Sequence, residues 1–555
     1  MFKHITIAIG VVLLTAGVCL SAPGDLDLTF GTNGYVLYES PTDYINDEGY
    51  AIALQTDGKI VVAGLTVGLN NDVLVLRYNS DGSPDQTFGT QGVVIYDSSN
   101  SDEGYGVVIQ KDGKIVVAGY SYIFEDYRLQ DVLVLRYNSD GSPDQTFGVN
   151  GVVTTNIEGS DYGNAVALQP DGKIVIVGKT SSASDTYALV IRYNTDGTLD
   201  NTFGENGIVT YNGTAGGWDT LADVAIQPDG KIIATGETSP ANFLALTDVL
   251  VLRYNSDGTP DVAFGANGVV TYDSPHHYFE QGSSISLQKD GRIFISGGIW
   301  DYSSYNNAVL ALRYDGDGNP DSTFGTGGVA TYNRGEPDFM YGNTGALLRD
   351  GRVFVAGYLN ADALIVLFKN NGELDSVFSG DGIGTYSYNE YAIAHGYAMA
   401  IQTDGKIVLA GTSSYHDNYS DFAVLLMRVI GVGLPPCTYD LTPTSQSFSS
   451  TGGDGSVNVT AQSGCSWTAT SNDSWIAIPS GSNGTGNGTV NYSVSANSST
   501  SSRTGTMSIA GETFTVTQGG GCSTWTDVIS KYNLYVSGQA SWNNVIECYN
   551  QYVSP

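Results

Sequence analysis

Hydrophobic and polar residues alternate in short runs that recur seven times between residues 24 and 430. Polar turn residues separate the runs, among them Thr56-Asp57-Gly58 and the stretch from Asn79 to Asp85. Short runs between turns predict β-strands, and we find no helical periodicity in them, so we expect four strands per unit. In the unit at residues 49–97 the four runs are Tyr50–Gln55, Lys59–Gly64, Val73–Tyr78 and Val93–Tyr96.

Two motifs mark the period of these units. Asp-Gly-Lys or Asp-Gly-Arg begins at Asp57, Asp112, Asp171, Asp229, Asp290, Asp350 and Asp404, at intervals of 54 to 61 residues. Gly-x-x-Asp-x-x-Phe ends at Phe30, Phe88, Phe147, Phe203, Phe264, Phe324 and Phe378. A repeat of this length with four strands predicts an all-β fold, a seven-bladed β-propeller over residues 23–430. A β-solenoid is the alternative, but tight Asp-Gly turns between neighbouring strands require antiparallel hairpins.

The phase of the repeat predicts how the ring closes. Tyr35–Tyr38 is a single strand ahead of the first full unit, and the last unit ends after its third strand, Phe422–Arg428. We therefore expect Tyr35–Tyr38 to become the outer strand of the last blade, which removes the open sheet edges. These units resemble the delta-60 repeat of many bacterial secreted proteins, and the run from Ala51 to Val62 also resembles NHL-type blades. That resemblance covers all seven units and implies a propeller, but it brings no established activity.

One face of the predicted propeller has variable loops, whereas the loops at the opposite end are nearly identical in every unit. Divergent loops on a repeated scaffold are typical of a binding face. Aromatic side chains beside acidic groups can stack on sugar rings or anchor a protein partner. For any single ring, packing between blades remains the favoured interpretation. The candidates for this ligand face are Tyr122, Tyr127, Trp218, Tyr278, Trp300, Tyr302, Tyr305 and Tyr341.

Most basic residues occupy repeat positions, and we expect them to pair with the repeated aspartates. Seven follow the Asp-Gly turns, and together with six arginines near the end of the third strand they make 13 of the 23 Lys and Arg residues. Leu367 replaces the arginine in the sixth blade, so the arginine is not needed in every blade. The six arginines are Arg77, Arg136, Arg192, Arg253, Arg313 and Arg428.

The acidic loops offer a weak calcium candidate at Asp315, Asp317 and Asp321. Oxygen ligands on alternate residues around glycine suit Ca²⁺, but the closing glutamate of an EF-hand is missing, so an Asx turn is the favoured interpretation. We predict no metal and no cofactor. The histidines do not recur between blades, and we find no nucleophile elbow, P-loop, zinc-protease or Rossmann motif. The sequence therefore predicts no catalytic residue.

A Gly/Pro linker at residues 431–436 precedes a segment rich in Ser, Thr, Gly and Asn. Residues 437–518 contain alternating runs such as Trp467–Ser471 and Thr489–Val494, which predict a small Ig-like β-sandwich. The runs Gly464 to Ala469, Ser474-Trp475-Ile476 and Val516-Thr517-Gln518 make this segment resemble a BACON domain, a family proposed to bind carbohydrate. Trp467 and Trp475 are then candidate sugar platforms, although a place in the core is the favoured interpretation.

The final segment, residues 519–555, contains a duplication. Trp525 to Ser537 returns 17 residues later as Trp542 to Ser554. Apolar residues at positions 525, 528, 529 and 532 predict an amphipathic helix, and the copy predicts a second one, so we expect a short helical hairpin. A docking or surface-retention tag and a simple capping hairpin are equally consistent with this pattern.

The first 22 residues predict a secretory signal peptide, because Lys3 and His4 precede an apolar run that ends at small residues. Later stretches are too short to span a membrane. In an oxidising compartment we expect disulfides among Cys437, Cys465, Cys522 and Cys548. The net charge of -34 argues against nucleic-acid binding, which needs a basic face.

Together these patterns predict an exported protein of the bacterial cell surface or exterior that binds glycan or a surface protein without turnover. The alternatives are a polysaccharide-degrading hydrolase or lyase with its site at the propeller channel, and a structural adhesin component. The hairpin adds a candidate docking surface. The sequence makes no prediction of oligomeric state.

Overall fold

The computed structural model describes most of the chain and divides it into two compact units, residues 1–433 and 434–555. The residues described are 22–41, 46–122, 129–157, 159–182, 185–213, 217–239, 246–275, 278–301, 307–335, 338–388, 393–414, 422–432, 439–461, 465–499, 501–521, 525–538 and 542–553. No helix among them is long and apolar enough to cross a membrane. The predicted signal peptide lies outside this set and stays a prediction.

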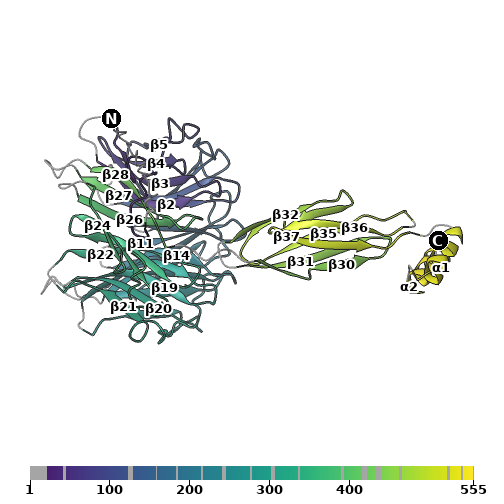
Figure 1. Ribbon diagram of the computed structural model, residues 1–555. Helices are drawn as coiled ribbons and strands as arrows, with labels where there is room; N and C mark the ends of the chain where they lie inside the picture. Colours follow the sequence, from purple (N-terminus) through teal and green to yellow (C-terminus); the bar gives the residue numbers. More distant parts are fainter. Residues whose placement is uncertain are drawn as a thin grey trace, which may run out of the picture. The chain divides into compact units, whose positions relative to one another are not determined.

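The first unit consists of four-stranded antiparallel sheets, which form the blades of a propeller (Figure 1). Each blade contains three long strands and a short outer one, as the alternating runs predict. The innermost strands are β2 (Asp47–Leu54), β6 (Ser101–Ile109), β10 (Ser160–Leu168), β14 (Trp218–Ile226), β18 (Phe279–Leu287), β22 (Met340–Leu347) and β26 (Ile393–Ile401). The second strands are β3 (Ile60–Val67), β7 (Ile115–Tyr122), β11 (Ile174–Ser181), β15 (Ile232–Ser239), β19 (Ile293–Trp300), β23 (Val353–Leu359) and β27 (Ile407–Ser414).

The third and fourth strands complete each blade on its outer side. The third strands are β4 (Asn71–Tyr78), β8 (Gln130–Tyr137), β12 (Thr186–Tyr193), β16 (Asp248–Tyr254), β20 (Ala308–Tyr314), β24 (Asp362–Phe368) and β28 (Phe422–Val429). The fourth strands are β5 (Val93–Tyr96), β9 (Val152–Thr155), β13 (Ile208–Tyr211), β17 (Val269–Tyr272), β21 (Val329–Tyr332), β25 (Ile383–Tyr386) and, for the last blade, β1 (Tyr35–Tyr38). We number the blades one to seven from β2 onward.

The ring closes as the repeat phase predicts. β1 pairs antiparallel with β28, so the outer strand of blade seven comes from the start of the chain. Each inner strand contacts the next, and β26 contacts β2, which completes the circle. Blades three and four are joined further by one parallel bridge, Thr186 to Trp218. The fold is therefore a closed seven-bladed propeller.

Each inner strand has a β-bulge at the same position of its pairing with the second strand. In blade one the register between β2 and β3 shifts between Gly49 and Ala51, and Gly49 faces Gly64 of β3. A Cβ atom at Gly64 would lie 1.8 Å from the carbonyl oxygen of Glu48, so only glycine fits there. The residue within the bulge, Tyr50, is left without a partner in the ladder.

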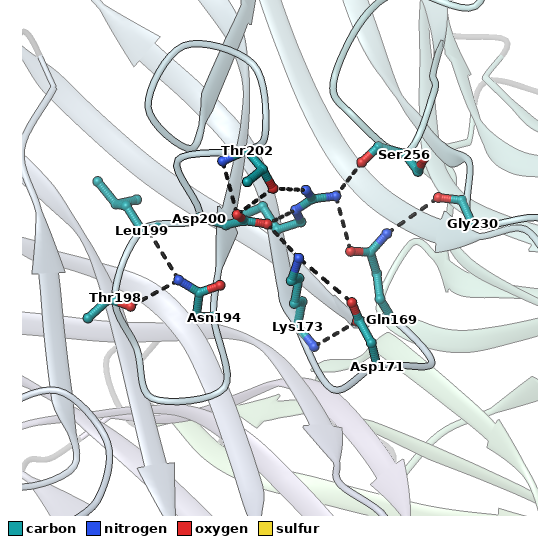
Figure 2. A network of polar contacts seen from close by, with 11 residues as sticks. Gln169, Asp171, Lys173, Asn194, Thr198, Leu199, Asp200, Thr202, Gly230 and Ser256 are labelled. Atoms are coloured by element: carbon teal, nitrogen blue, oxygen red, sulfur yellow. Dashed lines mark hydrogen bonds and ion pairs between the residues drawn. The ribbon is translucent and has the colours of Figure 1, made fainter.

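The predicted ion pairs between arginines and repeated aspartates are present. In blade three, Nε of Arg192 lies 2.7 Å from Oδ2 of Asp200, which Nζ of Lys173 also contacts at 2.9 Å (Figure 2). The guanidinium lies over the Phe203 ring and donates to the carbonyl oxygen of Ser256 in blade four. Five more blades repeat the pair: Arg77–Asp85, Arg136–Asp144, Arg253–Asp261, Arg313–Asp321 and Arg428–Asp27.

Blade six lacks the arginine of the third strand but keeps the cation of the Asp-Gly turn. Leu367 fills the arginine position and is fully buried. Arg352, from the Asp-Gly-Arg turn, contacts Asp375 with 3.4 Å between Nη1 and Oδ2, as the turn lysine contacts Asp200 in blade three. The repeated aspartate therefore keeps a cation when the arginine of the third strand is absent.

The second unit begins with a β-sandwich of two sheets. One sheet has the order β29-β31-β35-β33, and the other has β30-β37-β36-β32-β34. A core of apolar side chains, including Val490, Tyr492 and Phe514, lies between them. The strands are β29 (Tyr439–Thr442), β30 (Ser445–Phe448), β31 (Gly453–Ala461), β32 (Ser466–Ser471), β33 (Ile476–Ser480), β34 (Asn483–Thr485), β35 (Gly488–Val494), β36 (Arg503–Ile509) and β37 (Glu512–Gln518).

The helical hairpin follows the sandwich. Its helices are α1 (Trp525–Val536) and α2 (Trp542–Val553), which contact each other. Their boundaries match the two copies of the duplication, so the predicted amphipathic pair is confirmed.

Candidate functional site

Aromatic side chains gather on the inner two strands of the blades, around the propeller axis. Nine rings form a chain of contacts that we call the aromatic belt. Its members come from every blade except the fourth: Tyr50, Tyr105, Tyr120, Tyr162, Trp300, Tyr341, Tyr358, His395 and Tyr397.

The belt is continuous from one blade to the next. Tyr50 stacks on Tyr105 of blade two, with 4.8 Å between ring centroids and 7° between planes, and contacts Tyr397 of blade seven at 5.5 Å. Tyr105 stacks on Tyr120 at 5.8 Å, and Tyr120 meets the edge of Tyr162 in blade three at 4.7 Å. Ring pairs at these distances and angles have the geometry that aromatic attraction favours.

The other half of the belt runs through blades seven, six and five. His395 stacks on Tyr358 at 4.4 Å and lies edge-on to Tyr397 at 6.4 Å. Tyr358 stacks on Tyr341 at 6.2 Å, and Tyr341 meets Trp300 edge-on at 5.8 Å. Apart from the buried Tyr341, these rings are partly exposed, so part of each remains accessible.

A cation and an acid continue the belt from blade three into blade four. Nζ of Lys179 lies 4.6 Å from the ring centroid of Tyr162 and 4.5 Å from that of Trp218. Burial lowers the pKa of Lys179, and the carboxylate of Glu237 opposes this shift. Burial raises the pKa of Glu237, whereas Lys179, Thr247 and Trp218 favour its charged form. The ring therefore has one charged sector beside a mostly aromatic remainder.

Hydrogen bonds to glutamates orient Tyr50 and Tyr105. The Tyr50 hydroxyl donates to Glu48 at 2.9 Å, and the Tyr105 hydroxyl donates to Glu103 at 2.7 Å. Burial raises the pKa of both phenols far above the usual range, with the nearby carboxylates adding to the shift in each case. Burial lowers the pKa of His395. At neutral pH the belt rings are therefore uncharged, and the acids beside them accept hydrogen bonds.

The belt lies toward the end of the propeller that carries the variable loops. Tyr50 and Tyr162 lie in the first halves of their inner strands, which begin at these loops, and Tyr105 is the middle residue of β6. Tyr120 and Tyr358 lie within the last three residues of β7 and β23, second strands that end at the same loops.

The predicted ligand-face residues fall into three groups. Tyr341 and Trp300 belong to the belt, and Tyr341 is buried in β22 at 8% exposure. Trp218 begins β14, 39% exposed, beside Lys179. Tyr122 ends β7, and Tyr278 precedes β18; both are partly exposed. Tyr127, Tyr302 and Tyr305 lie outside the described residues.

The two candidate tryptophans of the sandwich lie in or against its core. The indole of Trp467 is 4% exposed and donates to the carbonyl oxygen of Gly486 at 2.8 Å. Trp475 packs against the core, with the guanidinium of Arg503 at 4.1 Å over its ring. Cys465 and Cys548 are buried, and Cys437 and Cys522 lie outside the described residues, so the disulfides stay predictions.

The calcium candidate forms a turn closed by its own side chains. Asp315 accepts hydrogen bonds from the backbone of Asp317 and Asn319, both at 2.9 Å. The Asp321 carboxylate contacts Arg313 and Arg292, both at 2.8 Å. Asp315 thus makes the Asx-turn bonds, and Asp321 serves the repeated ion pair.

Most belt residues were not among the sequence candidates, although a signal for them exists. They flank one repeated glycine: Glu48-Gly49-Tyr50, Glu103-Gly104-Tyr105, Tyr162-Gly163, Tyr341-Gly342 and His395-Gly396-Tyr397. The positions beside this glycine change from blade to blade, whereas the strand around them is constant. Aligning the six units that contain the glycine reveals a variable, often aromatic position inside the scaffold; blade four has Leu221 in its place.

Comparisons with known proteins agree with the two units. A family model described as a domain of unknown function (DUF5122) beta-propeller matches residues 55–88, 110–147, 169–203, 227–264, 288–324 and 402–425. A model described as the viral BACON domain matches residues 438–521. No curated protein matches the chain.

Similar solved structures include proteins of different kinds. A protein of unknown function from Dyadobacter fermentans is 12% identical and covers 71% of this chain and 99% of its own, with a TM-score of 0.36. Apo prolyl oligopeptidase B from Galerina marginata is 12% identical over 73% of this chain and 58% of its own, with a TM-score of 0.38. A GH43 endo-arabinanase from Bacillus licheniformis is 10% identical over 58% and 92%, with a TM-score of 0.29. Scores this low carry no functional argument, and the two family matches assign the chain a DUF5122 β-propeller domain followed by a BACON domain.

Proposed function

We propose that this chain is an exported binding protein whose propeller holds a neutral glycan at the aromatic belt. The belt is the observation that carries the proposal, because flat uncharged rings stack on sugar faces while nearby acceptors bind hydroxyl groups. A propeller followed by a BACON domain favours a binding or interaction role. The predicted signal peptide at residues 1–22 supports export.

Charge restricts the ligand to a neutral one. The chain has a net charge of -34, and Glu48, Glu103 and Glu237 lie beside the belt. A polyanion would meet repulsion there. A glycan without acidic groups meets acceptors that suit its hydroxyl groups, and a surface protein is the other partner that such rings fit.

Binding to a panel of neutral polysaccharides tests the proposal, measured by affinity electrophoresis and then calorimetry. Tyr105→Leu removes a ring from the middle of the belt and should weaken binding at least about 10-fold, or about 1.4 kcal/mol. Tyr137→Phe is the matched control, because Tyr137 is a buried tyrosine at the end of β8 in the same blade. It should leave binding unchanged.

Two results would count against the proposal. Binding that survives Tyr105→Leu would exclude the belt as the site. Release of reducing ends from the same polysaccharides would replace simple binding with hydrolysis. A lyase would release unsaturated products, which absorb in the ultraviolet.

A further inference from the structure

The helical hairpin exposes an unusually large apolar surface. Ten of its aromatic and aliphatic side chains are 41% to 66% exposed. They occupy one face of each helix, because they follow a helical spacing of three and four residues. They are Trp525, Ile529, Tyr532, Tyr535, Val536, Trp542, Ile546, Tyr549, Tyr552 and Val553.

These faces converge on one groove between the helices, with a volume of about 380 Å³. Its walls are pseudo-symmetric, because each groove residue of α1 recurs 17 positions later in α2. The paired residues are Trp525 and Trp542, Val528 and Val545, Ile529 and Ile546, and Tyr532 and Tyr549.

Aromatic contacts hold the two walls together. Trp525 contacts Tyr549 and Tyr552 of α2 at 6.2 and 5.6 Å between ring centroids. Trp542 contacts Tyr532 and Tyr535 of α1 at 6.3 and 5.2 Å. Each tryptophan thus packs on two tyrosines of the opposite helix, and the groove has a defined shape.

Charge distinguishes this hairpin from the propeller, which carries most of the acidic residues. Residues 525–553 contain Asp527, Lys531 and Glu547 as their charged side chains, whereas the whole chain has a net charge of -34. Two copies of the protein would repel each other at most surfaces. Two hairpins can approach with little repulsion.

From these observations we infer that the hairpin is a self-association module, in which the groove of one chain packs against that of a second copy to form a four-helix bundle. The ten exposed side chains present roughly 800–900 Å², taking about 200 Å² for a whole aromatic side chain. A stable interface buries about 800 Å² per partner. The patch therefore has the area that a dimer needs.

The internal symmetry of the groove favours a second copy over an unrelated partner. A two-fold dimer uses the same patch on both chains, so each patch must complement itself. Both walls carry the same four residue types. The side-chain ridges of α1 or α2 can therefore fit between the ridges of α1 or α2 in the second copy. Helical hairpins that pair in this way bury their apolar faces in a common core.

Sedimentation velocity of the chain without its signal peptide, from roughly 0.1 to 50 µM, tests the inference. The unsubstituted protein should change from monomer to dimer within this range. Ile529→Asp combined with Ile546→Asp places two charges in the groove and should weaken association by at least about 100-fold. The control, Asn533→Asp with Asn550→Asp, adds the same charges at exposed positions outside the groove and should leave the dimer intact.

A second pair of substitutions keeps the test valid if the aspartates unfold the hairpin. Val536→Lys with Val553→Lys changes side chains that are 66% and 48% exposed, so the hairpin itself needs little repacking. This pair should also yield monomers, and helical circular dichroism should persist. An unsubstituted chain that stays monomeric at every concentration would overturn the inference, as would a dimer unaffected by both pairs. If the chain stays monomeric and the hairpin binds a different protein, that protein and not a second copy is the occupant of the groove.

Discussion

Replacing Arg192 with leucine tests the energetic role of the repeated ion pair, since blade six carries leucine at the same position. The substitution removes the 2.7 Å contact with Asp200 and the hydrogen bond to Ser256 of the next blade. Burial opposes ionisation of Asp200, but Thr202, Lys173 and Arg192 hold its pKa well below the usual range. Asp200 therefore stays charged in the variant.

The magnitude follows from what remains around Asp200. Breaking a buried pair costs about 3–5 kcal/mol when the remaining charge has no other partner. Lys173 stays at 2.9 Å and Thr202 still donates at 2.7 Å, so we expect about 3 kcal/mol, including the lost bond to Ser256. An unfolding entropy of about 2.1 cal/mol/K per residue over roughly 400 residues converts this to a decrease in Tm of about 4 °C.

Differential scanning calorimetry at pH 7 measures the effect. Arg192→Leu with Asp200→Asn should recover part of the loss, because no buried charge remains. Lys173→Met is the matched control: its ammonium is more exposed than the arginine, and its removal should lower Tm by less than about 1 °C. A decrease below about 1 °C for Arg192→Leu, or a double variant less stable than the single one, would refute the reasoning.

Two further predictions concern a buried acid and the sandwich core. Burial raises the pKa of Glu280 from 4.5 to about 7, so the propeller should lose up to about 3 kcal/mol of stability as pH rises from about 4.5 through 7. Glu280→Gln should flatten this part of the Tm-against-pH curve, and identical curves for both proteins would contradict the assignment. Trp467→Ala should cost the sandwich about 3–5 kcal/mol in urea unfolding, because it empties a site that is 4% exposed. Thr468→Ala, at an exposed neighbouring position, should change little, and equal losses would contradict a core role for Trp467.

The repeat made most of the propeller predictable from sequence. The predicted strand Val93–Tyr96 has the same first and last residues as β5. The repeat phase also predicts the pairing of Tyr35–Tyr38 with the last blade. In the sandwich, the longer strands were expected, whereas β29, β30, β33 and β34 were missed. These strands have three to five residues each, too short for alternation to separate them from turns.

The belt was harder to predict for a different physical reason. Repeats are recognised by what stays constant, and the belt positions differ between blades. Tyr50 also lies in a β-bulge, which redirects a side chain relative to simple alternation. The sequence therefore points to aromatic residues of the loops, whereas most rings of the aromatic belt lie on the strands.

The closure of the ring has a consequence for biosynthesis. Asp27 and Arg428 form one of the repeated buried pairs although 401 residues separate them. The first strand of the propeller thus has no partner until the last blade exists, and it stays unpaired through the synthesis of six blades. A chain cut short within blade seven would leave an exposed edge at each end of the ring. Closure therefore acts as a check on completeness, because only a full-length chain hides both edges from proteases and from other strands.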